Sequence, residues 1–139
     1  MRRNRWAAAW ATLLCVFLLG CGADTTYSEQ HTVALIAKST ETEFWLSVFA
    51  GAEAAATEYN LKLTITGPET EEDYETQNQM VADAVAEGAQ AIVFSAIDYE
   101  NNAAAIDDAA KKGAKIVAID SSVDSQACLL YTSPSPRDR

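Results

Sequence analysis

The sequence has little cysteine, histidine and arginine, and these shortages exclude several kinds of site. Between residues 22 and 127 there is no cysteine and no arginine, and His31 is the only histidine of the whole chain. A disulfide framework and a thiolate metal site are therefore excluded from this part of the chain. A Ser/His/Asp or Cys/His catalytic arrangement would have to use His31, which lies in the junction before the first predicted strand. We expect no catalytic residue, no metal and no enzyme.

Glycine-rich phosphate loops are also missing. The segment after the first predicted strand, residues 38–45, contains neither G-x-G-x-x-G nor G-x-x-x-x-G-K-[ST]. Backbone amides of such loops cradle phosphate groups, so their absence disfavours dinucleotide and nucleoside triphosphate binding. We expect no cofactor.

Positive charge is scarce in the body of the chain. Residues 22–127 contain five lysines against 19 acidic residues, and the whole chain has a formal net charge of −10. Nucleic acid is therefore excluded as a partner, because its phosphates require a basic surface. We interpret most of the acidic residues as a solvated surface that keeps the protein soluble.

The first 20 residues are typical of an export signal. Three arginines among the first five residues precede an apolar run over residues 7–19. This run is too short for a comfortable membrane span and lies where a secretory signal peptide should. The segment 18–21, Leu-Leu-Gly-Cys, resembles the lipobox of bacterial lipoproteins, so we predict a signal peptide over 1–20 and a lipid anchor at Cys21. Two or more acyl chains give stable attachment; the alternative is an ordinary signal peptide with an incidental cysteine.

The two segments that flank the body differ from it in composition. Residues 21–30 are small and polar and fit a tether that follows the lipidated cysteine. Residues 128–139 hold two of the three prolines and the only arginines after Arg5. They resemble the translated read-through of a sequencing adapter, so we predict that the protein's own sequence is cut near Ala127. A proline-rich linker is the alternative.

Four short apolar runs predict the strands of a parallel sheet. They are bounded by polar residues and are rich in β-branched side chains, as suits strands that are buried on both faces. They cover residues 32–37, 61–66, 91–94 and 115–119. The alternation of strands with helical patterns over residues 31–127 predicts a Rossmann-like α/β domain with helices on both faces of the sheet. The expected strand order is 2-1-3-4.

The helical patterns lie between these runs. They cover residues 42–59, a segment from Thr70 to the stop at Gly88, and residues 99–112 with Gly113 as the stop. Spacings of three and four residues place Phe44 and Tyr59 on the buried stripe of the first helix. An acidic first turn favours a start of the second helix at Thr70. Asp98 is the predicted N-cap of the third.

The predicted topology indicates where a ligand would bind. In an open α/β sheet, ligands bind beyond the carboxyl ends of the strands. Phe44 and Trp45 follow the first strand, and an aromatic ring suits the apolar face of a sugar. Since Phe44 fits the core stripe, Trp45 is the stronger candidate for a ring that lies across the cleft. The alternative is that both rings belong to the core.

Polar residues follow the third and fourth strands. Ser95 and Asp98 come after the third, and Asp120 and Ser121 come after the fourth. Carboxylates beside small hydroxyl groups are suited to accept hydrogen bonds from a polyol. Asp98 has a competing role as a helix cap, whereas Asp120 has none, so Asp120 is the stronger candidate.

Together these strand-end segments resemble the start of a type 1 periplasmic binding protein, in the sugar-binding family related to ribose-binding protein. The segments are 38–45, 59–61, 67–69, 91–93, 96–98 and 119–121. The resemblance implies that residues 31–127 are the first part of lobe 1 of a fold whose two lobes close on a sugar. It implies that Phe44 and Trp45 are a stacking pair, that Ser95 and Asp98 contact the ligand, and that Asp120 accepts its hydroxyl groups.

The function implied by the resemblance is solute capture without chemistry. We expect an exported lipoprotein, anchored to the outer face of the cytoplasmic membrane, that delivers a small polar solute such as a sugar to an ABC permease. The alternative is a ligand-binding lipoprotein that feeds a membrane sensor or chemoreceptor. A LacI-type repressor would need a basic DNA-binding segment where this chain has an export signal. An enzyme using Asp98 or Asp120 would lack a phosphate loop, a metal cluster and a well-placed histidine.

One lobe of a two-lobe protein has only part of the residues that contact a ligand in the closed form. Only a molecule that contacts both lobes favours closure, so one lobe should neither close nor bind tightly. We therefore expect residues 31–127 to be at best marginally folded by themselves, and binding experiments call for the protein encoded by the complete gene.

Overall fold

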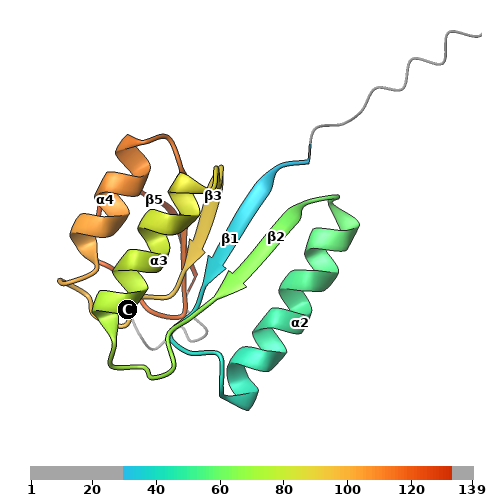
Figure 1. Cartoon of the computed structure of the whole chain (residues 1–139), viewed down its shortest axis with the longest axis horizontal. Helices are drawn as coiled ribbons and strands as arrows, with labels where there is room; N and C mark the ends of the chain where they lie inside the picture. Colours follow the sequence, from blue (N-terminus) through green and yellow to red (C-terminus); the bar gives the residue numbers. More distant parts are fainter. Residues whose placement is uncertain (1–29, 133–139) are drawn as a thin grey trace, which may run out of the picture.

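The computed structural model describes residues 30–132, in which five parallel strands form one sheet with helices on both faces (Figure 1). The strands are β1 (Thr32–Ile36), β2 (Lys62–Thr66), β3 (Ala91–Phe94), β4 (Lys115–Ile119) and β5 (Cys128–Thr132). The helices are α2 (Glu43–Glu58), α3 (Tyr74–Ala86) and α4 (Ala103–Lys111). The strand order is β2-β1-β3-β4-β5. The predicted α/β class, the four predicted strands and their order are therefore confirmed.

The predicted signal peptide and Cys21 lie outside the described residues, as does most of the predicted tether. Within the described part of the chain, no helix has both the length and the apolar character needed to cross a bilayer. The lipid anchor therefore stays a prediction from the sequence.

Strand β5 is formed by residues whose composition differs from that of the body. Cys128–Thr132 pairs with β4 in parallel, with an irregular register between Ile116 and Val117. The apolar runs predicted four strands and no strand here, so the fifth strand is a correction to the predicted sheet. The pairing describes how these residues lie, and their origin as adapter read-through stays a prediction.

The larger core lies between the sheet and helices α3 and α4, which cover the same face (Figure 1). Because strand side chains alternate between faces, Ile36, Phe94 and Ile116 all point to this side and are fully buried. Val81 of α3 and Ile106 of α4 pack against them. Complete burial of such a side chain stabilises the fold by about 1.5–3 kcal/mol. This core packs against β1, β3 and β4 together and so fixes the position of their carboxyl ends relative to one another.

Helix α2 covers the opposite face, and its buried stripe differs from the predicted one. Trp45 is 1% exposed and Phe49 is 9% exposed, and both pack against Leu35 of β1. Phe44 and Tyr59, predicted to be buried, are 54% and 68% exposed. Val48 and Ala52, which the same spacing places on the predicted stripe, do pack against this core, so the stripe is right in the middle of the helix and wrong at its two ends. Alanines lie on several sides of this helix, so the sequence has no polar face that would fix the phase.

Helices α3 and α4 begin later than predicted. The predicted start at Thr70 is wrong, because Asp73 caps α3 and its Oδ1 accepts a hydrogen bond of 2.9 Å from the Thr76 N–H. The prediction that Asp98 caps α4 is also wrong, because Asn102 occupies the N-cap position. Short polar side chains occur at several positions near each start, and the sequence alone does not show which one caps the helix.

The predicted glycine stops are confirmed. Gly88 and Gly113 follow α3 and α4 with φ of 88° and 100°, in the left-handed region that side chains with a Cβ rarely adopt. Asn60 takes the same role after α2 with φ of 52°, which asparagine tolerates better than most residues.

We expect the cap of α3 to make the stability depend on pH under acidic conditions. The side-chain and backbone hydrogen bonds from Thr76 lower the pKa of Asp73 below its ordinary value of 3.8. Its stabilising contribution is therefore complete above pH 3.8 and is lost as the pH falls through the lower pKa of the folded state. Asp73→Ala should lower the Tm at pH 7, and its deficit should shrink below pH 3.8 in circular dichroism melts.

Asp73→Asn is the matched control, because asparagine caps a helix nearly as well and does not titrate. It should melt close to the wild type at pH 7. A deficit of Asp73→Ala that stays constant from pH 7 to pH 2 would contradict the assigned role of the carboxylate.

Candidate ligand-binding site

Three neighbouring strands end at one polar cluster. Strands β1, β3 and β4 lie side by side and run parallel, so the residues that follow them meet at the same edge of the sheet. Lys38 follows β1, Ser95 follows β3, and Asp120 with Ser121 follows β4. We call these four residues the carboxyl-edge cluster.

Asp120 is the centre of the carboxyl-edge cluster. Its Oδ2 lies 3.1 Å from Lys38 Nζ and accepts hydrogen bonds of 3.2 Å from the hydroxyl groups of Ser95 and Ser121. The side chains of Lys38 and Asp120 are 20% and 27% exposed, so the ion pair is partly desolvated and still reachable. An ammonium donor, a carboxylate acceptor and a hydroxyl that does either can bind the hydroxyl groups of a neutral ligand. Among residues 30–132 no group of three or more His, Cys, Asp or Glu could hold a metal ion.

The backbone at Asp120 adopts an unusual conformation. Its φ is 59°, and the N–H of Ser121 donates to the carbonyl of Ile119 at 2.6 Å across the turn. Left-handed backbone costs energy for residues with a Cβ, and such strain gathers at binding sites that need a particular geometry. The turn directly follows β4 and brings the carboxylate to Ser95 at the end of β3.

Asp98 caps a turn in the loop after β3. Its Oδ1 accepts hydrogen bonds from the N–H groups of Glu100 at 3.0 Å and Asn101 at 2.8 Å. These bonds, that of Asn101 first, lower the pKa of Asp98, so it is ionised at neutral pH. The Oδ1 atom of the buried Asn102 accepts a hydrogen bond of 2.8 Å from the Asp98 N–H, which holds this loop in place. Asp98 therefore lies at the same edge of the sheet as the carboxyl-edge cluster, with its carboxylate engaged in its own turn.

The two aromatic rings at the start of α2 are placed the opposite way round from the expectation. Trp45 is buried, and its Nε1–H donates to Glu71 Oε1 at 3.0 Å. Phe44 is exposed and meets Trp45 edge to face, with ring centroids 5.0 Å apart. The prediction that Phe44 packs in the core while Trp45 lies free is wrong, and so is the alternative that both rings are core. Phe44 is the exposed ring of the pair.

Glycine at position 67 lets the loop after β2 approach the loop after β1. A Cβ at Gly67 would lie 3.2 Å from the carbonyl carbon of Ser39 and 3.3 Å from the carbonyl oxygen of Ala37. These distances are tighter than ordinary contacts with backbone atoms. Together with the bond between Trp45 and Glu71, this approach holds the start of α2 against the sheet.

Two residues of this region were missed by the reasoning from sequence. Lys38 is the first residue after the apolar run 32–37. Asp120 is the first residue after the apolar run 115–119. Charges of opposite sign at two strand ends were a signal that the two side chains could pair. Gln77 is fully buried on α3, four residues before Val81. A long polar residue on an apolar stripe was the signal that it has internal hydrogen-bond partners.

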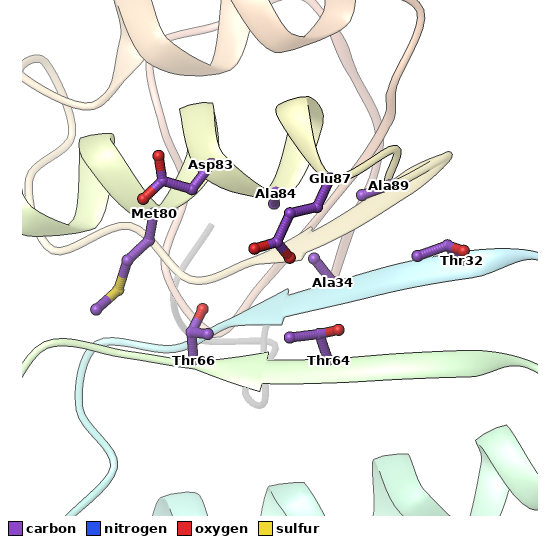
Figure 2. A pocket seen from close by; sticks show the side chains of 9 residues that line it. All are labelled: Thr32, Ala34, Thr64, Thr66, Met80, Asp83, Ala84, Glu87 and Ala89. Carbon is purple, nitrogen blue, oxygen red and sulfur yellow. The ribbon is translucent and has the colours of Figure 1, made fainter.

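A groove lies away from the carboxyl-edge cluster, between β2 and α3 (Figure 2). Its volume is about 180 Å³, and its lining includes Thr64 and Thr66 of β2 and Asp83 and Glu87 of α3, of which Glu87 points toward β2. The groove forms because α3 packs against β1 and leaves this face of the edge strand β2 uncovered. None of its lining residues belongs to the carboxyl-edge cluster, so we do not assign the ligand site to it.

Comparison with known proteins finds one matching family and several similar structures. The sequence profile of the periplasmic binding protein domain matches residues 33–138. A carbohydrate transporter solute-binding protein from Agrobacterium radiobacter, in complex with D-arabinose, is 32% identical over 75% of this chain with a TM-score of 0.72. A sugar transporter from Clostridium phytofermentans is 31% identical over 75% with a TM-score of 0.72. A solute-binding protein of an ABC transporter from Actinobacillus succinogenes, with bound D-allose, is 26% identical over 70% with a TM-score of 0.66.

The chain spans only part of these three proteins. It covers 35% of the first, 39% of the second and 34% of the third. The similarity therefore concerns about a third of each relative.

Proposed function

Because the chain belongs to the periplasmic binding protein family, we propose that it forms part of an extracytoplasmic protein that captures a sugar. The family and the similar structures are solute-binding proteins and not enzymes. The relatives described above that hold a sugar are bound to D-arabinose and D-allose. The observation that carries the proposal is the convergence of Lys38, Ser95 and Ser121 on Asp120 at the carboxyl edge of the sheet.

The chemistry of this edge suits a neutral ligand with many hydroxyl groups. Lys38 donates hydrogen bonds, Asp120 accepts them, and their charges cancel, so the pair favours neither an anion nor a cation. The exposed ring of Phe44 supplies an apolar face for the C–H groups of a sugar ring. We propose Phe44, Asp98, Asp120 and Ser121 as ligand contacts, with Lys38 added. Ser95 is fully buried and donates to Asp120, so we propose that it holds the Asp120 carboxylate in place.

The buried Trp45 has a supporting role in this proposal. Its edge-to-face contact with Phe44 and its bond to Glu71 fix the start of α2. Trp45 therefore orients Phe44 and does not itself stack on the ligand.

We also propose that the protein is lipid-anchored at Cys21 and delivers its sugar to an ABC permease. The basic start, the short apolar run and the Leu-Leu-Gly-Cys segment support the anchor. The relatives named as ABC transporter components support the permease. Genes for an ATPase and a permease beside the complete reading frame are the expected finding. A histidine kinase gene in their place would contradict transport and support sensing.

A thermal-shift screen on the mature protein encoded by the complete gene tests the sugar proposal. Pentoses, hexoses, polyols and nucleosides are compared at millimolar concentration. A ligand at 100 times its Kd stabilises the folded state by about 2.7 kcal/mol, which raises the Tm by several degrees. We expect such a rise with a small subset of the sugars. A flat response across all sugars would count against the proposal.

A further inference from the structure

Gln77 is a fully buried polar side chain directly beneath the carboxyl-edge cluster. Its Nε2 donates two hydrogen bonds of 2.9 Å, one to the carbonyl of Ala37 and one to the carbonyl of Ser95. Its Oε1 accepts a hydrogen bond of 3.1 Å from the Ile97 N–H. One amide thus satisfies three backbone groups in the two loops that leave β1 and β3.

These three backbone groups lie where the ladder between β1 and β3 ends. The last pair in register is Ile36 with Phe94, followed by a bond of 3.1 Å from the Ser95 N–H to the Ile36 carbonyl. Beyond that point the two chains separate into their loops. There the Gln77 side chain links the two chains in place of strand pairing, because it donates to the Ala37 carbonyl after β1 and to the Ser95 carbonyl after β3.

We propose that Gln77 is a positioning residue of the ligand site, which sets the spacing between the end of β1 that carries Lys38 and the end of β3 that carries Ser95. Both of these residues bind the same oxygen of Asp120, so a change in that spacing pulls at least one of them away from it. The inference rests on the proposed function only in naming the site a ligand site; the bonds of Gln77 are independent of it.

The chemistry of the side chain allows two variants that separate positioning from packing. Methionine fills a similar volume with no N–H or C=O, so Gln77→Met leaves two carbonyls and one N–H without their buried partner. Glutamate has the shape of glutamine. When ionised it turns an oxygen toward two carbonyl oxygens, and when protonated it offers one donor and one acceptor. Burial and the facing carbonyls disfavour the ionised form, so Gln77→Glu should be protonated at pH 7 and keep part of the native geometry.

The experiment measures two quantities on the protein encoded by the complete gene. The first is the affinity for the sugar found in the thermal-shift screen, by calorimetry at pH 7 and pH 5. The second is hydrogen exchange in peptides that span residues 93–99. Gln77→Met should bind the sugar about tenfold more weakly at both pH values and should exchange faster over this segment. Gln77→Glu should lie between Gln77→Met and the wild type at both pH values, with the wild type measured at each pH.

Val81→Ala is the matched control, because Val81 is buried one turn further along the same helix and has no side-chain polar group that could bond the two loops. It should lower the Tm and leave both sugar affinity and exchange over residues 93–99 unchanged. If Gln77→Met lowers the Tm and leaves affinity within twofold of the wild type, Gln77 is only a packing residue and the inference fails. Should Gln77→Met not fold, Gln77→Glu decides, and a sugar affinity and an exchange rate equal to those of the wild type at both pH values overturn the inference.

A failure of the proposed function gives a different result. In that case the wild type binds no sugar, and exchange alone decides on Gln77. Faster exchange over residues 93–99 in Gln77→Met, but not in Val81→Ala, would still support the positioning role. Equal exchange in both variants would overturn it.

Discussion

Asp120→Asn should weaken sugar binding by the complete protein by about 100-fold. The change removes a charged acceptor and leaves the partly buried Lys38 without its partner, and a hydrogen bond to a charged group contributes about 1.5–3 kcal/mol. Asparagine tolerates the left-handed backbone found at this position, so the fold should survive. Titration calorimetry with the sugar from the screen measures the loss.

The control for this change is Asp124→Asn in the same loop. Asp124 is exposed and accepts a hydrogen bond from the Tyr99 hydroxyl at 3.2 Å, outside the carboxyl-edge cluster. Its substitution makes the same loss of one charge and should leave the affinity unchanged. Equal affinities for Asp120→Asn and Asp124→Asn would remove Asp120 from the site.

Trp45→Ala should lower the free energy of unfolding by about 3–5 kcal/mol, the usual cost of deleting a large buried aromatic side chain. The ring is 1% exposed and its Nε1–H bonds to Glu71, so the substitution leaves a cavity in the core under α2 and removes that bond. Urea unfolding followed by circular dichroism measures the effect without depending on tryptophan fluorescence.

Phe44→Ala is the neighbouring control with the opposite expectation. Phe44 is 54% exposed and loses only its edge-to-face contact with Trp45, so Phe44→Ala should lower the free energy of unfolding by no more than about 1.5 kcal/mol. Its effect should instead be on sugar affinity. A larger loss of stability from Phe44→Ala than from Trp45→Ala would restore the phase that the sequence predicted for α2.

The strands could be predicted from the sequence because each buried strand is an apolar run between polar neighbours. Residues 91–94 and 115–119 were predicted with the bounds that the structure shows. The phase of α2 could not be predicted, since Phe44 and Trp45 are adjacent and the alanines after them leave several faces apolar. The tertiary contact of Trp45 with Glu71, 26 residues away along the chain, decides which ring is buried.

The site was predictable where topology alone determines it. Parallel strands bring their carboxyl ends to one edge, so Ser95, Asp120 and Ser121 could be predicted to meet, and they do. Lys38 was missed because a lysine after a strand is common, and its pairing depends on a side chain that reaches past β3. Gln77 was missed because its hydrogen-bond partners are backbone groups, and every residue has these groups whatever its side chain. The ligand contacts themselves stay predictions.

The position of β1 in the middle of the sheet determines how late this domain can begin to form. β1 is the first strand of the chain, yet its Val33 pairs with Ala91 of β3 as well as with Leu63 of β2. Closing such long loops lowers the entropy of the chain before the stabilising contacts between the strands have formed. Sheets with distant pairings therefore fold slowly. A nascent chain can therefore pair β1 only with β2, on one side, until β3 has been synthesised.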